Sequence, residues 1–327
     1  MNKQSPLVSV LMPVYNGEKY LAEAIESILN QTFVNLEFLI INDGSTDRSL
    51  EIINSFVDSR IVLIDNASNK GLIYSLNRGI ALAQGRYIAR MDADDVSNPL
   101  RIERQIAFLE AHPDVGYCGT WARKIDASGN VLGCMRRLTQ SEPLRISLLF
   151  SSPYIHPTMV IKSELLKKYC YDKDFKHVED FELWTRLSVE AKGINIPSFL
   201  LSYRWHGDNI SVKQNTEQGR TSELIVTRSV EALGLQMTHE EYLVHISTIR
   251  IGTTEFDFKK LRQWFNKLLM ANSTQQRYDQ NVFKALLWSR WIVAVIRSRR
   301  WFQLLNFGYP YSFKIGWNMF RMLRDKR

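Results

Sequence analysis

The first hundred residues alternate short apolar runs with segments of helical periodicity. The apolar runs of strand length are Leu7–Met12, Leu36–Ile41, Ile61–Ile64 and Tyr87–Met91. Helical spacing marks three segments between them: residues 21–29, residues 50–56 with Ser45 or Thr46 as the expected cap, and Gly71–Ala83. This alternation predicts an α/β fold with a mostly parallel sheet flanked by helices.

The same pattern continues more loosely to residue 211 and then changes. Further helices are expected after Pro99, at Leu144–Phe150 and at His177–Leu187, and further strands at Val115–Ala122, Tyr154–Lys162 and Ile194–Trp205. Beyond Ser211 four segments have helical composition: Ser222–Leu233, Glu240–Ile251, Phe256–Met270 and Tyr278–Arg297. We therefore expect a catalytic α/β domain over residues 1–212, followed by an all-helical extension over residues 213–327.

Polar side chains follow three of the predicted strands at the point where each strand ends. They are Tyr15 and Asn16 after the first strand, Asp43 after the second and Asp92–Asp95 after the fourth. In open parallel sheets, ligands bind beyond the carboxyl ends of the strands. We therefore expect these groups to converge on one crevice, although they lie far apart in the sequence.

Three carboxylates stand together in the last of these groups: Asp92, Asp94 and Asp95. Carboxylates that are packed together repel one another and lose hydration, so such a cluster needs a compensating cation. Oxygen ligands suit Mg²⁺ or Mn²⁺, which in turn can hold the oxygens of a diphosphate. The alternative is a solvated acidic turn that caps the helix beginning near Pro99. The expected convergence of the other polar groups favours the metal site.

Several classes of protein are disfavoured. No Gly-x-Gly-x-x-Gly follows the first strand and no Gly-Lys-Ser/Thr loop is present, which argues against a dehydrogenase and a P-loop protein. The three cysteines lack metal-ligand spacing and fit packing residues in a reducing compartment. The N-terminus lacks the apolar stretch of a signal peptide, and no run of about 18 apolar residues occurs. We therefore expect a cytoplasmic protein.

An ordered set of short motifs resembles the family 2 glycosyltransferases. The motifs are Pro13-Val-Tyr-Asn16, Asn42-Asp-Gly-Ser45, Asn69-Lys-Gly71 with Asn77-Arg-Gly79, Asp92-Ala-Asp-Asp95, Glu179-Asp180 and Tyr203-Arg-Trp-His206. Each motif alone is weak, but the ordered set over roughly residues 7–211 is specific. The resemblance implies a GT-A fold and an inverting enzyme that uses a nucleotide-sugar donor.

The resemblance also implies a nucleotide site. Tyr15 matches the ring that stacks on the base, and Asp43 matches the carboxylate that accepts a hydrogen bond from the imide N–H of the base. The same site is expected to include Pro13, Asn16, Asn69 and Arg78. An imide-bearing base favours UDP- or dTDP-sugars over GDP-sugars. Many members of the family carry an acid at the position of Asn42; this departure leaves Asp43 in place.

A metal site follows from the same resemblance. Asp92 is expected to bind the ribose or to lie in the outer shell of the metal, and Asp94 is expected to be a direct ligand supported by Asp95. His206 either completes the shell of the metal or forms a local hydrogen bond in its loop. The Mn²⁺ or Mg²⁺ would neutralise charge on the departing diphosphate.

Asp180 matches the general base that removes the proton of the acceptor hydroxyl, and Glu179 is the alternative base. Acids in a first helical turn are often only dipole partners, so this alternative stays open. Three more residues are weaker candidates for contacts with acceptor or diphosphate: His156, Trp184 and Arg204. His156 is otherwise a structural residue at a strand start, and Arg204 otherwise pairs with an acid of the core.

The expected function is transfer of one sugar from a nucleotide diphosphate donor to a hydroxyl of a glycan or lipid-linked glycan, as in cell-surface polysaccharide or lipopolysaccharide assembly. A sugar nucleotidyltransferase would need a glycine-rich basic loop where Pro13-Val-Tyr-Asn16 stands. A non-catalytic nucleotide-sugar-binding or scaffold protein descended from these enzymes is the remaining alternative. The presence of Asp94 and Asp180 argues against that alternative.

The C-terminal segment carries an excess of positive charge. Of the chain's net +8, residues 282–327 contribute ten Lys or Arg against one acid, so the remainder is close to neutral. The apolar stretch Ala285–Ile296 is followed by basic and aromatic residues: Arg297, Arg299, Arg300, Trp301, Tyr309, Tyr311, Trp317 and Phe320. This mixture predicts a helix at an anionic membrane surface. The alternative is a helical subdomain packed on the catalytic domain. No nucleic-acid-binding module is recognised.

Overall fold

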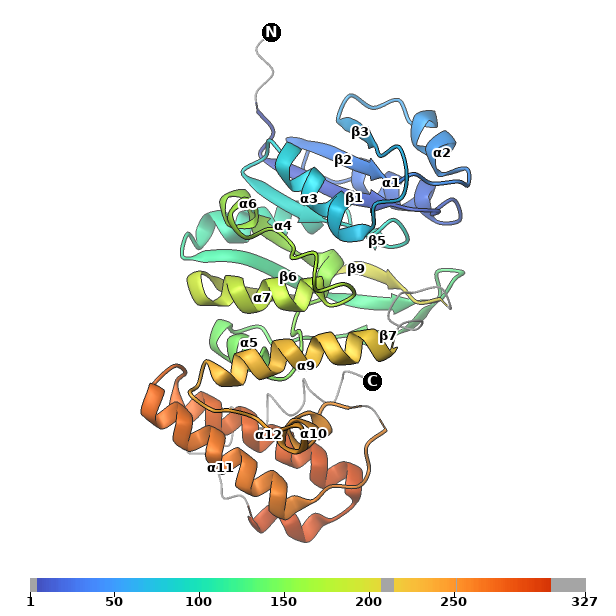
Figure 1. The fold of residues 1–327 in the computed structure, drawn as a ribbon. Coiled ribbons are helices and arrows are strands. Elements are labelled where there is room, and N and C mark those ends of the chain that lie inside the picture. Colours follow the sequence, from blue (N-terminus) through green and yellow to red (C-terminus); the bar gives the residue numbers. More distant parts are fainter. Residues whose placement is uncertain (1–4, 207–214, 251, 307–327) are drawn as a thin grey trace. The chain divides into compact units, whose positions relative to one another are not determined.

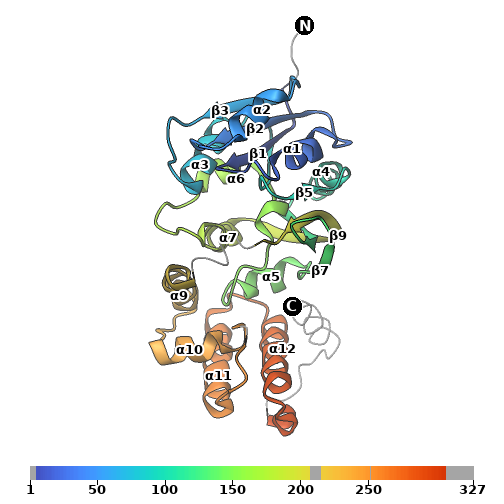
Figure 2. The same ribbon diagram turned by 90° about the vertical axis from the view of Figure 1, so that its right-hand side faces the viewer.

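The structure is a computed structural model that describes residues 5–206, 215–250 and 252–306. The chain divides into two compact units, whose elements are labelled in Figure 1 and turned by 90° in Figure 2. The first unit consists of Met1–Met135 and Tyr154–Asn215, and the second of Arg136–Pro153 and Thr216–Arg327. All three predicted polar strand ends belong to the first unit.

A mixed sheet forms the centre of the first unit (Figure 1). Its strands are β1 (Val8–Val14), β2 (Leu36–Asn42), β3 (Ile61–Asp65), β4 (Tyr87–Arg90), β5 (Val96–Ser97), β6 (Val115–Ile125), β7 (Val131–Met135), β8 (Val160–Lys162) and β9 (Lys192–Arg204). In the order β3-β2-β1-β4-β8-β6-β9-β5, the first four strands run parallel, and β8 is antiparallel to both of its neighbours. β6 and β9 are parallel, β5 is antiparallel to β9, and β7 pairs with β6 off this path. The expected α/β class is confirmed; the parallel pairs are those among β3, β2, β1 and β4 and the pair of β6 with β9, and the other pairs are antiparallel.

Among the described residues, six α-helices flank the sheet of the first unit (Figure 1). They are α1 (Leu21–Leu29), α2 (Ser49–Ser55), α3 (Leu72–Leu82), α4 (Arg101–Ala111), α6 (Ser163–Tyr169) and α7 (Glu179–Glu190). Ile25 of α1 belongs to the same buried cluster as Val10 and Met12 of β1. Leu11 points to the opposite face, where it lies against Gly79 of α3. The alternating side chains of β1 therefore fill two apolar layers.

The segment predicted as one strand over Tyr154–Lys162 forms two elements. A 3-10 helix, η1 (His156–Thr158), comes first, and β8 occupies only the last three residues. Pro157 has no N–H for a strand ladder, and its fixed φ suits the helical turn. The expectation that a strand begins at Ile155 is therefore wrong.

The expected cap of α2 is also wrong. This helix begins at Ser49, and neither Ser45 nor Thr46 caps it. Instead, the backbone N–H of Asn16 donates to Ser45 Oγ (3.1 Å), and the N–H of Thr46 donates to Asn16 Oδ1 (2.8 Å). These bonds join the loop after β1 to the loop after β2, which are the two loops expected to hold the nucleotide.

The second unit is helical among its described residues. Its elements are α5 (Ser141–Ser147), α9 (Asn215–Glu231), α10 (His239–Ser247), α11 (Phe258–Gln275), α12 (Gln280–Ser298) and the 3-10 helix η2 (Trp301–Asn306). The guanidinium of Arg290 lies over the ring of Phe150, with 5.0 Å to its centroid. His245 accepts a hydrogen bond from Trp264 Nε1–H (2.9 Å) and donates from Nε2 to the carbonyl of Leu149 (2.7 Å). The segment 136–153 is thus tied into the helical unit.

The apolar stretch Ala285–Ile296 does not lie at a surface. Nearly all of its side chains are buried inside the second unit, including Trp291 and Arg290. No helix among the described residues is long and apolar enough to cross a membrane. Trp301 and Phe302 of η2 are exposed, at 57% and 66%. The four aromatic residues named beyond η2 lie outside the described residues.

Close approach of two backbones at Gly85 yields a test of this fold. A Cβ at Gly85 would lie 2.5 Å from the backbone N of Ser9, whereas a Cβ at Gly133 would meet nothing within 4 Å. We expect Gly85→Ala to lower the free energy of unfolding by about 1–3 kcal/mol because β1 must shift. Chemical denaturation followed by circular dichroism measures this loss. Gly133→Ala is the matched control, and equal stability of the two variants would contradict the packing described.

Candidate active site

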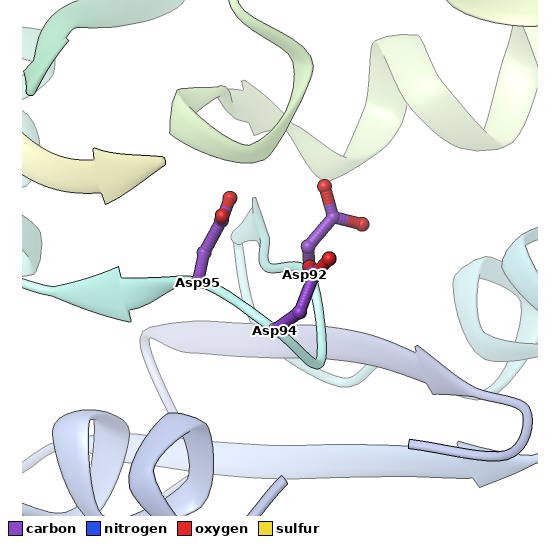
Figure 3. A group of neighbouring side chains, drawn as sticks. All are labelled: Asp92, Asp94 and Asp95. Carbon is purple, nitrogen blue, oxygen red and sulfur yellow. The ribbon is translucent and has the colours of Figure 1, made fainter. Parts of the chain in front are cut away.

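Three carboxylates form the centre of the candidate site. Asp92, Asp94 and Asp95 lie in the loop between β4 and β5, and one oxygen of each lies within 4.8 Å of the others. Figure 3 shows their side chains projecting from this loop toward the same side. A metal site needs at least three acidic, histidine or cysteine side chains whose ligand atoms lie close together. Among the described residues, these three aspartates meet that condition.

Each of the three carboxylates has a different partner. Arg90 Nη1 forms an ion pair with Asp92 Oδ1. His206 Nε2 lies 2.9 Å from Asp94 Oδ2. The backbone N–H of Arg204 donates to Asp95 Oδ1 at 2.8 Å. Groups from the end of β4 and the end of β9 thus hold together three charges that repel one another.

The electrostatics of this cluster favour a bound cation. Burial raises the pKa of Asp95 well above its usual value, and the charges of Asp92 and Asp94 add to the shift. Burial also raises the pKa of Asp92, against the opposing charge of Arg90. Asp95 Oδ2 is buried and has no hydrogen-bond partner among the described residues. A divalent cation would supply that missing partner and relieve the repulsion, so the residues present fit Mg²⁺ or Mn²⁺.

Arg204 is turned into the protein. Its side chain is nearly fully buried, Nε donates to the carbonyl of Asp94 (2.8 Å), and Nη2 pairs with Glu23 (2.5 Å). The guanidinium also lies over the ring of Tyr20. Of the two roles expected for Arg204, these contacts fit pairing with an acid, and they hold the backbone that carries Asp94.

The predicted nucleotide residues lie at the ends of neighbouring strands. Because β2, β1 and β4 are adjacent in the sheet, Asp43, Tyr15 and Asp92 leave it at one edge. Tyr15 is exposed, as a ring that stacks on a base must be. Asn16 joins the two loops through the hydrogen bonds described above, and Pro13 lies in β1.

Asp43 is buried and nearly saturated with hydrogen bonds. Its Oδ1 accepts from Asn66 Nδ2 (2.6 Å) and from the N–H of Lys70 (3.0 Å), and its Oδ2 accepts from the N–H of Gly71 (2.8 Å). A carboxylate offers about four acceptor positions. One position on Oδ2 is therefore left for a ligand N–H.

The remaining nucleotide candidates differ in position. Arg78 Nη1 donates to Asn66 Oδ1 and to the carbonyl of Asp65 (3.0 Å), so it orients the partner of Asp43. Asn69 is exposed in the loop before α3. Asn42, the departure from the family pattern, donates to Asp65 Oδ1 at 2.7 Å. An aspartate at this position would instead face a second carboxylate.

The two predicted base candidates begin helix α7. Glu179 is buried, whereas Asp180 is partly exposed. Burial and the charge of Asp180 raise the pKa of Glu179 to about 7. Close to neutral pH, Glu179 is therefore partly protonated, and Asp180 is the more exposed of the two candidates.

His156 and Trp184 lie in an aromatic cluster behind these acids. Trp184 is fully buried, and its ring packs against His156 and Tyr154. His156 Nε2 is 2.7 Å from the hydroxyl of Tyr171. Burial, helped by the charge of Arg90, lowers the pKa of His156 well below its usual value. His156 is therefore neutral at pH 7 and brings no positive charge to a diphosphate.

Two residues near the site were not among the predicted ones. Tyr171 is held by Asn77, whose side chain donates to its carbonyl (2.8 Å) and accepts from its N–H (2.9 Å). Nothing in the sequence marks Tyr171, because this contact spans 94 residues. Arg90 does carry a signal. It stands two residues before Asp92, and extended chains place such residues on one side.

Comparisons with known proteins agree with the resemblance. The model of the family described as glycosyl transferase family 2 matches residues 9–170. An uncharacterized glycosyltransferase of Haemophilus influenzae is 35% identical over 237 residues, which cover 69% of this chain and 73% of that protein.

Two solved structures share the fold. TarS 1–349 of S. aureus in complex with UDP-GlcNAc gives a TM-score of 0.59 at 17% identity and covers 94% of this chain and 93% of that one. The mannosyltransferase PcManGT of Pyrobaculum calidifontis, in complex with GDP-Man and Mn²⁺, gives 0.52 at 15% identity and covers 99% and 85%. These likenesses confirm the GT-A type of fold. With the matched relative and the family model, they show that the chain belongs to the family 2 glycosyltransferases, as its motifs predict.

Proposed function

We propose that this glycosyltransferase moves a sugar, with inversion, from a nucleoside diphosphate donor to a hydroxyl of a glycan or lipid-linked glycan in cell-surface polysaccharide assembly. The observation that carries the proposal is the cluster of three carboxylates within 4.8 Å, at the sheet edge that also presents Asp43. Donor and metal would lie at this edge. The acceptor would lie on the side of α7, where Glu179 and Asp180 begin the helix.

The base of the donor would be recognised by Tyr15 and Asp43. The ring of Tyr15 is exposed for stacking, and Asp43 Oδ2 keeps one acceptor position. A single acceptor fits the one imide N–H of uracil or thymine and supports UDP- or dTDP-sugars over GDP-sugars. TarS and PcManGT, which share the fold, are complexed with UDP-GlcNAc and GDP-Man respectively.

Asp94 and Asp95 would hold the divalent metal, with His206 beside Asp94 and Asp92 toward the ribose. When bound, the ion acts as a Lewis acid that offsets the charge of the leaving diphosphate. Arg204 contributes by holding both ligands, the carboxylate of Asp95 and the backbone of Asp94. It donates from its N–H to Asp95 and from Nε to the carbonyl of Asp94.

Asp180 would take the proton from the acceptor hydroxyl, whose oxygen then attacks the anomeric carbon on the face opposite the diphosphate. Glu179 would lie beside Asp180 in this step. Burial raises the pKa of Glu179, so it would carry less negative charge than a solvated carboxylate. His156 and Tyr171 would form an uncharged wall beside the two acids. Burial raises the pKa of Tyr171, and the charges of Asp180 and Asp92 add to that shift against the charge of Arg90.

The exposed end of the second unit would contact an anionic membrane at its cytoplasmic face. Trp301 and Phe302 are exposed, and the preceding Arg299 and Arg300 are exposed as well. Aromatic rings beside arginines suit the headgroup region of a bilayer. This surface replaces α12 as the site of the expected membrane contact, because α12 is buried.

The metal site is tested by Asp94→Asn. We expect the affinity for Mn²⁺ in the presence of UDP to fall by about 10- to 100-fold or more, because an amide is a poorer ligand than a carboxylate. Electron paramagnetic resonance of free Mn²⁺ measures this affinity without reference to turnover. Asp174→Asn is the control, because it makes the same chemical change at an exposed aspartate that does not belong to the cluster. Unchanged Mn²⁺ affinity in the Asp94 variant would exclude it as a ligand.

The general base is tested by comparing Asp180→Asn with Glu179→Gln. We expect Asp180→Asn to slow sugar transfer by about 10²- to 10⁴-fold while UDP binds as before, because the proton of the attacking hydroxyl has no acceptor. Release of UDP from a panel of UDP-sugars, with glycan or lipid-linked acceptors present, measures the rate. The loss for Glu179→Gln should be smaller. The opposite order of the two variants would assign the base to Glu179.

Membrane contact is tested with vesicles that contain anionic lipid. We expect the double variant Trp301→Ser and Phe302→Ser to partition less onto the vesicles than the wild type, because two exposed aromatic anchors are lost. Co-sedimentation measures the bound fraction. Val131→Ser with Leu132→Ser removes a similarly exposed apolar pair from β7 and is the matched control. Equal partitioning of all three proteins would rule out η2 as the contact.

A further inference from the structure

Arg90 is a buried cation at the end of β4. Its side chain is only 5% exposed, and its carbonyl accepts a hydrogen bond from Arg101 Nη2 at 2.7 Å. Arg101 is itself fully buried and is oriented by Gln105 (3.0 Å). Gln105 in turn donates to the carbonyls of Cys118 and Thr158. The backbone that carries Arg90 is therefore fixed by contacts with α4, β6 and η1.

Asp92 is the acid that pairs with the guanidinium of Arg90. Nη1 lies against Asp92 Oδ1 as an ion pair. Nε is buried and has no hydrogen-bond partner among the described residues. A buried guanidinium without other acceptors is costly unless a charge compensates it. The attraction between Arg90 and Asp92 therefore fixes both side chains.

The charge of Arg90 also reaches the acceptor side. It acts on Tyr171 and Glu179 as well as on Asp95 and Asp92. Arg90 is thus a cation shared by the aspartate cluster and by the acids that begin α7.

We propose that Arg90 is a positioning residue of the donor site: its charge holds the Asp92 carboxylate in the orientation that receives the nucleotide sugar. The role of Asp92 toward the donor rests on the proposed function. Without Arg90, the half-buried Asp92 carboxylate would face Asp94 and Asp95 without the cation that pairs with it, and it would turn away from them. Arg90 acts through Asp92 and does not itself touch the donor.

The proposal is tested by a double-mutant cycle with Arg90→Met and Asp92→Asn. Calorimetric titration with UDP at saturating Mn²⁺ gives the affinity of each protein. We expect R90M to weaken UDP binding by about 10- to 100-fold in the wild-type background, as loss of an outer-shell partner does. In the D92N background R90M should change the affinity by less than about threefold, because the partner through which it acts is gone.

Arg86→Met is the matched control, because Arg86 is exposed just before β4 and pairs with Glu110. It should bind UDP like the wild type. Wild-type affinity of R90M, or an equal loss from R90M in both backgrounds, would overturn the proposal. If the wild type binds no nucleoside diphosphate, the proposed function fails instead, and the two failures are distinguishable.

Arg90→Lys covers the case in which R90M does not fold. A lysine keeps the positive charge beside Asp92, which is the part of the ion pair on which the proposal rests. We expect R90K to bind UDP within about threefold of the wild type. A loss in R90K as large as that in D92N would show that charge on this side chain does not position Asp92, and would overturn the proposal.

Discussion

Repulsion among three carboxylates is the constraint that organises this site. Asp92, Asp94 and Asp95 present oxygens within 4.8 Å of one another. Unit charges at such distances repel by several kcal/mol in a protein, roughly 4 kcal/mol at an effective dielectric constant of 20. The fold meets this repulsion with an ion pair, an imidazole and a backbone N–H, each serving a different aspartate. A divalent cation would complete the same task, which is why the three carboxylates fit the proposed metal site.

The side chains and N–H groups that contact the three aspartates come from strands far apart in sequence. The sheet brings these strands close together. Arg90 ends β4, whereas Arg204 ends β9 and His206 follows it, so more than a hundred residues separate the two halves of the site. On the other side of β4, the adjacent strands β1 and β2 bring Tyr15 and Asp43 to the same edge. The residues proposed for nucleotide recognition and those proposed for metal binding are therefore neighbours because their strands are neighbours. The order of the strands, rather than any one loop, defines the site.

Local sequence patterns were sufficient to predict most strands and helices of the first unit. Apolar runs and polar strand ends predicted the parallel strands and the grouping of Tyr15, Asp43 and Asp92, because strand ends in a parallel sheet meet at one edge. Contacts between distant residues were not predictable. The tie from Asn77 to Tyr171 and the inclusion of residues 136–153 in the helical unit have no local signal. The burial of α12 was missed for a related reason: an apolar helix looks alike in sequence whether protein or lipid covers it.

The central claim is that one metal-dependent site binds a pyrimidine nucleoside diphosphate. Calorimetric titration of the wild-type protein with UDP, dTDP and GDP, each with Mn²⁺ and with EDTA, tests it most directly. The account predicts binding of UDP or dTDP that requires Mn²⁺, and weaker binding of GDP. Failure of the folded protein to bind any of the three, or binding of equal strength in EDTA, would contradict it.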